Sequence, residues 1–310
     1  MKKHLGRAAA WLITAGLLLF LFKTIRFADV VAATRTAEPW TVPGLLACIV
    51  AIYFADSFAI WKTFGWFLAP LRFGQVLVVR GATYLLAVIN YNVGQGAIVY
   101  FVHRAFGVPV MRGIATVLLV MGINVLALLF LATAGLKVAP AIPSYIPTVL
   151  IVAWVGLAFY ALLVALKPRV LATRPLLDVL LGAGFKGHAK ALVVRLPHIA
   201  SLVALQYTAL HAFHVDVPLG QAVVTLPIVF FIGVLPISVQ GLGVTQATMV
   251  FFFARYAPGT EDLQKATVLA ASLVTQTVAT IFQVVLGLAC LRTKTGRELD
   301  TAAKAAKPAS

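Results

Sequence analysis

Two ionisable residues, Asp56 and Arg80, lie inside long apolar stretches of the sequence. A charged side chain at membrane depth is costly unless it pairs with another group or reaches water. Asp56 precedes Lys62 by six residues and Arg80 follows Arg72 by eight, so in helices both would lie about 9–12 Å from a boundary marked by basic residues. This equal depth predicts a structural ion pair between Asp56 and Arg80. The alternative is that Arg80 extends to the membrane interface.

Two segments rich in glycine and amides interrupt apolar stretches. Residues 90–97 read Asn-Tyr-Asn-Val-Gly-Gln-Gly-Ala, and residues 236–244 read Pro-Ile-Ser-Val-Gln-Gly-Leu-Gly-Val. Glycine permits backbone conformations and close approaches that a Cβ forbids. Helices starting near Ala97 and Val244 would also offer free N–H groups to a phosphate. The alternative interpretation is close helix packing or a loop outside the membrane.

We expect these segments and the last apolar stretch to form a substrate-binding site. In the last stretch, Ser272, Gln276, Thr280 and Gln283 are spaced by four, four and three residues, which places them on one helical face. They line a groove or hold helices together. The predicted substrate-binding residues are Asn90, Asn92, Gly94, Gln95, Gly96, Gln240, Gly241, Gly243, Gln246, Gln276 and Gln283.

Patterns typical of catalysis, metal binding or ATP binding are weak. His211 and His214 lie near Asp216 but have no third ligand at a suitable spacing. The segment 182–188 reads Gly-Ala-Gly-Phe-Lys-Gly-His and lacks the Gly-Lys-Ser/Thr ending of a phosphate loop. One intramembrane acid is too few for a carboxylate pair. We therefore expect no enzyme activity, no metal and no cofactor.

The elements that position these residues are membrane-spanning helices. Hydrophobic residues make up 62% of the chain and charged residues 11%, whereas a soluble domain has about 25% charged residues. Continuous apolar runs, rather than alternating ones, exclude barrel strands. We expect an all-α, polytopic membrane helix bundle of about eight spans. Six are simple, at about 8–25, 40–61, 113–136, 145–166, 196–214 and 265–291, and two are broken, at about 74–106 and 219–256.

The basic residues predict the orientation of the chain. Most of the 25 Lys and Arg residues lie near the termini, in the interval 167–195 and at a few other ends of apolar stretches. Because such residues mark cytoplasmic segments, we expect both termini and a basic 167–195 loop to be cytoplasmic in a plasma (inner) membrane. The net charge of +16 reflects this sorting and anionic headgroups, so no nucleic-acid partner is expected.

The two broken segments are related by an internal repeat. Each Gly-x-Gly precedes a short apolar run and then a span containing Ala-Thr-Val-Leu, at 115–118 and at 266–269. Three spans separate the segments, and an odd number reverses direction, so they would be re-entrant hairpins entering from opposite faces. The chain is then a single transmembrane domain, 1–310, built from two inverted repeats: repeat A at about 1–140 and repeat B at about 141–295, followed by a cytoplasmic tail at 296–310.

The motifs also resemble a known family. Residues 235–246, Leu-Pro-Ile-Ser-Val-Gln-Gly-Leu-Gly-Val-Thr-Gln, resemble the signature of the lysylphosphatidylglycerol synthase transmembrane region, also called the flippase-like family. The first motif, followed by His-Arg-Ala-Phe-Gly at 103–107, is similar to the family's earlier motif. The resemblance implies an eight-span bundle with re-entrant helices that moves lipids or lipid-linked molecules between leaflets. The family's aminoacyl-transferase domain is absent, so no lysyl transfer is expected.

The resemblance also shows departures. Family members usually carry Glu at the position of Gln246, and Glu and Arg where this chain has Ala97 and Tyr100. An acid common in the following span corresponds to Asn124. We expect a translocase that moves a lipid or lipid-linked molecule without ATP. The alternatives are a non-transporting scaffold of a lipid-biosynthesis pathway and an intramembrane transferase. Expected partners are membrane lipids or a lipid-linked substrate, with a homodimer or lipid-pathway enzymes as further partners.

Overall fold

The computed structural model describes residues 27–89, 91–137, 144–168, 170, 174–234 and 243–293. Throughout these ranges the chain forms helices joined by short connections, and none of the described residues is in a strand. The expected all-α class is therefore confirmed. The expected first span at 8–25 and the tail at 296–310 lie outside the described residues.

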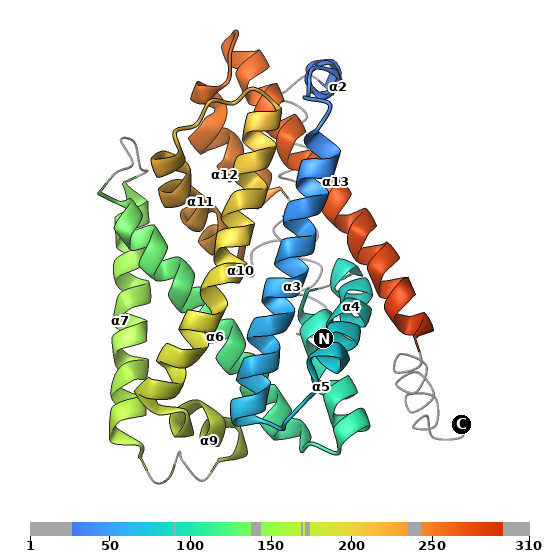
Figure 1. The fold of residues 1–310 in the computed structure, drawn as a ribbon. Helices are drawn as coiled ribbons and strands as arrows, with labels where there is room; N and C mark the ends of the chain where they lie inside the picture. The colour runs from blue at the N-terminus through green and yellow to red at the C-terminus, as the bar shows by residue number, and fades with distance from the viewer. Residues whose placement is uncertain are drawn as a thin grey trace, which may run out of the picture. The chain divides into compact units, whose positions relative to one another are not determined.

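Within these described ranges, five helices are long and apolar enough to cross a membrane (Figure 1). Each has 22 to 32 residues, and about 20 suffice to cross the hydrocarbon core. They confirm the expected spans at 40–61, 113–136, 145–166, 196–214 and 265–291, although the fourth helix begins earlier than expected. These helices are α3 (Thr41–Phe67), α6 (Val110–Gly135), α7 (Tyr145–Leu166), α10 (Gly184–Ala212) and α13 (Glu261–Arg292).

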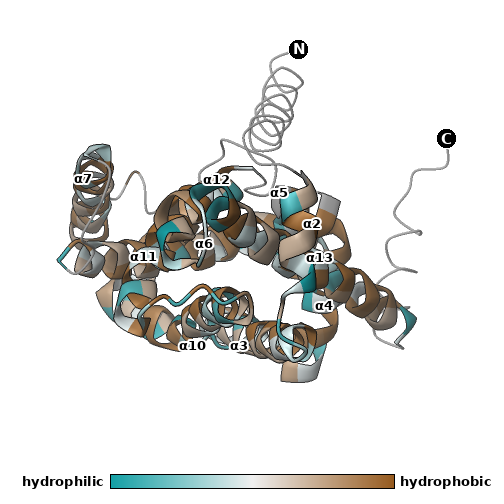
Figure 2. Ribbon diagram, turned by 90° about the horizontal axis from the view of Figure 1, so that it is seen from above, coloured by the Kyte–Doolittle hydropathy of each residue, from teal (hydrophilic) through white to brown (hydrophobic). Residues whose placement is uncertain are grey.

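Helix α7 shows why lipid must surround the protein. Ile151, Val152 and Phe159 are each more than 60% exposed on the protein surface. Ile151 and Val152 are adjacent, so the exposed apolar residues lie on more than one helical face. A helix that is hydrophobic all round is buried in a large core or spans a membrane. Hydrophobic residues make up most of this and the other helical ribbons (Figure 2).

The interval 167–195 is largely helical, which corrects the expectation of a basic loop. Helix α9 (Pro175–Gly182) begins with a proline in its first turn, where the missing N–H costs nothing. Gly184, with φ of +57°, follows it and begins α10. Arg195 therefore lies three turns inside a long helix rather than in a loop.

The first broken segment is a pair of helices, α4 (Phe73–Ile89) and α5 (Tyr91–Phe106), that pack against each other. Helix α5 begins at Tyr91, so the expected start near Ala97 is wrong. Gly94 lies in the first turn of α5, where a Cβ would come within 2.9 Å of the Ala87 Cα. The glycine therefore lets the two helices approach closely. Both helices are shorter than a full crossing, and the direction in which the hairpin enters the membrane stays a prediction.

The second broken segment contains α11 (Leu219–Val234) and α12 (Val244–Phe253), which also contact each other. A short 3₁₀ turn, η2 (Ala254–Tyr256), follows α12. The expected helix start near Val244 is confirmed. The connection over 235–242 lies outside the described residues.

The chain divides into two compact units. Unit 1 includes the short helix α2 (Phe27–Arg35), α11 and α12, and unit 2 includes α4, α5 and α9. The core of unit 2 contains Ile60 and Phe64 from α3 together with residues of the α4–α5 hairpin such as Ile98. The inverted repeats stay a prediction. Unit 1 consists of 1–50, 128–146 and 200–279, and unit 2 of 51–127, 147–199 and 280–310.

Candidate functional site

Asp56 is the centre of a buried cluster of charged side chains in unit 2. It lies in α3 and is 1% exposed. Its Oδ2 accepts a hydrogen bond from Nε of Arg80, in α4, at 2.5 Å. Its Oδ1 accepts one from Nη1 of Arg195, in α10. The predicted pair of Asp56 and Arg80 is therefore confirmed, and a second arginine joins it.

Two further polar residues complete the cluster around Arg195. Nε of Arg195 donates to Oδ1 of Asn124, in α6, at 3.2 Å. His198 follows Arg195 by three residues on the same helical face, and its Nδ1 is 4.0 Å from Oδ1 of Asp56. His198 also has a hydrogen bond to the backbone of Ile52. Four helices, α3, α4, α6 and α10, thus each contribute a polar side chain to one buried site.

The charges of this cluster do not cancel. It contains one carboxylate and two guanidinium groups, and guanidinium stays protonated at any pH a protein meets. Every acidic residue of the chain other than Asp56 lies outside the interiors of the apolar stretches. The site therefore carries an excess positive charge at membrane depth, where uncompensated charge is costly.

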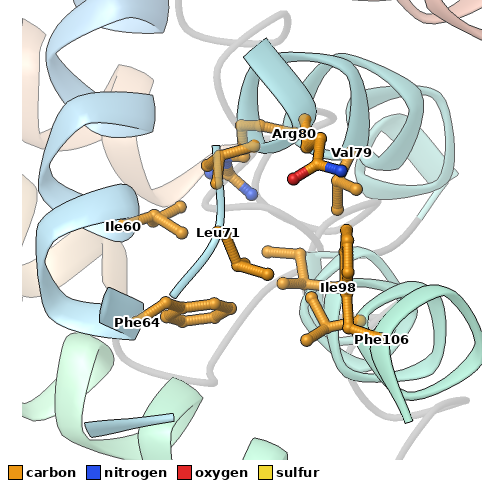
Figure 3. A pocket seen from close by; sticks show the side chains of 10 residues that line it. Ile60, Phe64, Leu71, Val79, Arg80, Ile98 and Phe106 are labelled. Carbon is orange, nitrogen blue, oxygen red and sulfur yellow. The ribbon is translucent and has the colours of Figure 1, made fainter. Parts of the chain in front are cut away.

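Arg80 differs from Arg195 in its surroundings. The carbon centre of its guanidinium is 4.7 Å from the ring centroid of Tyr84, a cation–π distance. Arg80 also lines a pocket formed by α3, α4 and α5, together with apolar residues (Figure 3). The rest of the lining is Ile60, Phe64, Leu71, Gln75, Val76, Val79, Ile98, Val102 and Phe106.

Sequence reasoning did not assign Arg195, His198 and Asn124 to this site. Arg195 is 7% exposed, although the sequence grouped it with the cytoplasmic basic residues. The signal for it was present: Leu192, Val193 and Val194 immediately precede it, which is unusual for a loop. Asn124 stands where the family resemblance implies an acid, and an acid there would balance the second guanidinium.

The first glycine motif is only partly described. Gly94 is buried against Ala87, whereas Gly96 is exposed and a Cβ there would meet no atom within 4 Å. Gln95 is half-buried. Asn90 and the side chain of Asn92 lie outside the described residues. Close packing therefore explains Gly94, and the predicted substrate-binding role of this motif stays a prediction.

The second motif begins helix α12. Gly243 precedes the helix with φ of +81° and ψ of −50°, a conformation that L side chains rarely adopt. The Gly243 N–H donates to Oε1 of Gln246 at 2.7 Å, so Gln246 caps the helix N-terminus and is 2% exposed. A glutamate at this position would accept the same bond. Gln240 and Gly241 lie outside the described residues.

The polar residues of α13 are more buried at its beginning. Ser272 and Thr275 are buried, whereas Gln276, Thr280 and Gln283 are half-buried. Thr275 donates to the backbone carbonyl of Ala271 at 2.7 Å, which satisfies its hydroxyl within the helix. The predicted contact of Gln276 and Gln283 with a substrate stays a prediction.

The histidines considered as metal ligands bind backbone groups. His211 Nε2 lies 3.3 Å from the carbonyl oxygen of Val217, and His214 Nε2 lies 3.2 Å from that of Thr36. Within the described part of the chain, no group of three His, Cys, Asp or Glu residues has the arrangement of a metal site.

Comparison with known families identifies the architecture. The family described as the lysylphosphatidylglycerol synthase TM region matches residues 7–287, which is most of the chain. No curated protein is similar enough in sequence to count as a relative. The match covers the charged cluster, both glycine motifs, four of the five long helices in full and all but the end of α13. The chain therefore belongs to the lysylphosphatidylglycerol synthase transmembrane-region family and is a multi-pass membrane protein.

Proposed function

We propose that this protein moves a lipid or a lipid-linked molecule between the leaflets of a membrane without ATP. Family membership connects the chain with lipid metabolism or transport. A translocase must lower the cost of carrying a polar headgroup through the hydrocarbon core, and this requires polar groups at membrane depth. The substrate would pass its headgroup along such groups while its tails stay in the bilayer.

The observation that carries the proposal is the buried cluster around Asp56. A structural tie between two helices needs one acid and one base. Here Asp56 binds both Arg80 and Arg195, and Arg80 also lines a pocket. Burying a second guanidinium has no evident advantage for stability, because replacing buried ion pairs by apolar residues is often neutral or stabilising. A role in binding the substrate headgroup would explain why the second guanidinium is buried here.

The glycine motifs would contribute the second part of the site. We propose that the amides around Gly94–Gly96 and Gly241–Gly243 contact the headgroup during its passage. Helix α12 begins at Val244, and helix N-termini attract anionic groups through free N–H groups. Oε1 of Gln246 already accepts a hydrogen bond from the Gly243 N–H. We therefore propose that Gln246 acts on a headgroup as a donor, through its amide nitrogen.

A non-transporting scaffold is the main alternative. The family resemblance implies acids where this chain has Gln246 and Asn124, and both amides accept intrachain hydrogen bonds, from the Gly243 N–H and from Arg195. An intramembrane transferase is disfavoured by the state of Asp56. A general base needs an available carboxylate, and both oxygens of Asp56 accept hydrogen bonds from arginine.

A leaflet-exchange assay with the purified protein separates translocation from these alternatives. Vesicles carrying a fluorescent phospholipid would be treated with a membrane-impermeant quencher, with and without the protein. Translocation makes the inner-leaflet probe accessible, and a scaffold or a transferase leaves it protected. Protein reconstituted at equal amounts that exchanges no faster than protein-free vesicles would contradict the proposal.

We further propose that both termini face the cytoplasm in the plasma membrane. Lys186 and Lys190 lie at the start of α10, and basic residues favour the cytoplasmic side. Ala189 and Ser144 are both exposed at helix ends, so single cysteines there can be labelled. From outside intact cells, a probe should react at Ser144→Cys and not at Ala189→Cys. The reverse pattern would overturn the orientation.

A further inference from the structure

We infer that an anionic phospholipid binds as a fixed structural lipid on the exposed face of α3 and α10, with its phosphate between Lys62 and Lys190. The inference goes beyond the proposed function, because such a lipid would serve a scaffold as well as a translocase. All the residues that carry it belong to unit 2.

The antiparallel packing of α3 and α10 within unit 2 brings the two lysines to the same end of the helix pair (Figures 1 and 2). A Cβ at Gly187 would lie 2.9 Å from Cζ of Phe67, the last residue of α3. Eight residues further along, α10 donates to Asp56, which lies eleven residues before the end of α3. Lys190 follows Gly187 by three residues and Lys62 precedes Phe67 by five, so both lie between these two contacts.

Trp66 connects the two lysines across the helix pair. Nζ of Lys190 is 6.0 Å from the centroid of the Trp66 ring, which is within cation–π reach. Lys62 precedes Trp66 by four residues and therefore lies on the same face of α3. Nζ of Lys62 is 4.2 Å from the centroid of the Trp61 ring. Trp66 is 42% exposed, and tryptophans at membrane surfaces lie at the level of the headgroups.

The protein does not neutralise the positive charge of this face. In the described part of the chain, neither Lys62 nor Lys190 forms an ion pair. Lys186 is exposed one turn before Lys190 on the same face of α10 and adds a third ammonium group. The described acids of unit 2 are Asp56, which is buried, and Asp178 in α9. Three ammonium groups without a carboxylate attract an anion, and a membrane surface supplies phosphate headgroups.

Apolar side chains continue the same face toward the middle of each helix, which identifies the anion as a lipid. Phe58 and Phe54 precede Lys62 by four and eight residues and are 36% and 49% exposed. On α10, Val193 follows Lys190 by three residues and is 63% exposed. Both helices thus place charge near the end and apolar surface further in. This order matches an amphiphile, with the phosphate at the lysines and the acyl chains along the apolar side chains.

A lipid bound in this way would hold α3 and α10 together beside the buried cluster. The cluster depends on this helix pair, because Oδ1 of Asp56 accepts a hydrogen bond from Arg195 across it. A phosphate that contacts one lysine of each helix bridges the pair at its end. A ligand that binds only the folded protein stabilises it, so the bound lipid should raise the unfolding temperature.

Lipid binding to the purified full-length protein tests the inference. Protein freed of its native lipid would be titrated with phosphatidylglycerol, as the anionic probe, and with phosphatidylcholine. Native mass spectrometry counts the bound lipid, and thermal unfolding is recorded at each lipid concentration. The test variant is Lys62→Gln with Lys190→Gln. The matched control is Arg112→Gln with Arg174→Gln, which also removes two exposed positive charges from unit 2 but leaves this face intact.

We expect the wild type and the control to bind phosphatidylglycerol more tightly than phosphatidylcholine and to unfold at a higher temperature when it is bound. One basic residue at a membrane surface changes the affinity for an anionic lipid about fivefold, so the test variant should bind phosphatidylglycerol about twentyfold more weakly. Equal binding by the test variant and the control would overturn the inference, since overall charge would then decide binding. So would equal binding of the two lipids by the wild type.

Two further arms make the result specific to a lipid and to charge. Inorganic phosphate should not raise the unfolding temperature as phosphatidylglycerol does, and an equal rise would overturn the inference because the apolar face would then be irrelevant. Lys62→Arg with Lys190→Arg keeps both charges and should retain binding, whereas its loss would show that the lysines act through packing. Each variant is compared with itself without lipid, and neither readout requires leaflet exchange, so failure of the translocase proposal leaves this test unaffected.

Discussion

Units 1 and 2 bury different kinds of polar side chain. Among the described residues of unit 1, the buried polar ones are uncharged, and they include Gln221, Thr225, Gln246 and Ser272. Unit 2 buries Asp56, Arg80 and Arg195, and His198 beside them. An uncharged polar side chain can form its hydrogen bond within its own helix. In α11, for example, Nε2 of Gln221 donates to the Thr225 hydroxyl at 2.9 Å. Buried charges need partners from several helices.

The two units also differ in the charged residues at their surfaces. The described helix ends of unit 2 carry many basic residues, such as Lys62, Arg72 and Lys190, whereas unit 1 mixes acids and bases, as in the pair of Glu261 and Lys265 at 2.5 Å. Among the described residues, buried charge and the excess of basic over acidic side chains are therefore both found in unit 2. If the protein handles an anionic headgroup, unit 2 is where electrostatics would recognise it.

The largest effect should come from Asp56→Asn. This substitution leaves Arg80 and Arg195 buried without a carboxylate, and breaking a buried ion pair typically costs about 3–5 kcal/mol. Thermal unfolding in detergent measures the loss. The double variant Asp56→Asn with Arg80→Gln should be more stable than Asp56→Asn alone, because one lone guanidinium is removed.

A triple variant that also carries Arg195→Gln tests whether the charged side chains of the cluster are coupled in their effect on stability. The triple variant has no buried charge in the cluster and should recover more of the stability. If the three losses simply add, the side chains are not coupled and the cluster does not exist as a unit. Arg72→Gln is the matched control, because it removes an exposed charge from the same helix.

A smaller effect is expected from Gly94→Val. A Cβ at Gly94 would lie 2.6 Å from the Ala87 Cβ, so α4 and α5 must separate, and overpacking of this kind costs about 1–3 kcal/mol. Gly96→Val is the control two residues later, since a Cβ there meets nothing within 4 Å. Equal unfolding temperatures for the two variants would show that the hairpin does not pack as described.

In unit 1, Gly243→Ala should act through the backbone. The φ of +81° at Gly243 is strained for any residue with a Cβ, at a cost of about 1–3 kcal/mol. Gly122→Ala is a suitable comparison, because it lies inside α6 with no atom within 4 Å of an added Cβ. A Gly243→Ala protein as stable as the wild type would show that this conformation is not required.

The smallest effect should follow changes at Gln246. Gln246→Ala removes the acceptor for the Gly243 N–H and should cost about 1 kcal/mol, as loss of a helix cap usually does. Gln246→Glu keeps an acceptor at the same position and should be close to neutral. The difference in unfolding temperature between the two variants measures the cap, and no difference would remove Gln246 from that role.

The sequence predicted the helices of this fold better than their connections. Long apolar runs identified α7 to the residue and α6 to within three residues, because the membrane sets their length, whereas α3 continues six residues beyond its expected end and α13 begins four residues before its expected start. The start of α10 was missed because Lys186 and Lys190 lower the local hydropathy. The break in the first hairpin was assigned to Gly94 and Gly96, whereas both lie inside α5. Glycine can serve close packing as well as a turn, and sequence does not distinguish the two.

The candidate site could also be predicted only in part from the sequence. Equal depth in the membrane was enough to pair Asp56 with Arg80, because few groups in lipid can neutralise each other. It could not find Arg195, whose depth became apparent only when α10 extended back to Gly184. The family resemblance implies an acid at the position of Asn124, but the hydrogen bond from Arg195 to Asn124 depends on α6 and α10 lying side by side at this point, which the sequence does not predict.

We propose that the buried cluster of unit 2 serves lipid translocation, and leaflet exchange by matched arginine variants tests this proposal. Vesicles with wild-type protein, Arg80→Gln and Arg72→Gln would be compared at equal reconstitution. We expect exchange by the wild type and Arg72→Gln, and about tenfold slower exchange by Arg80→Gln because it loses one charge-assisted contact. Wild-type exchange no faster than in protein-free vesicles, or equal exchange by all three proteins, would contradict it.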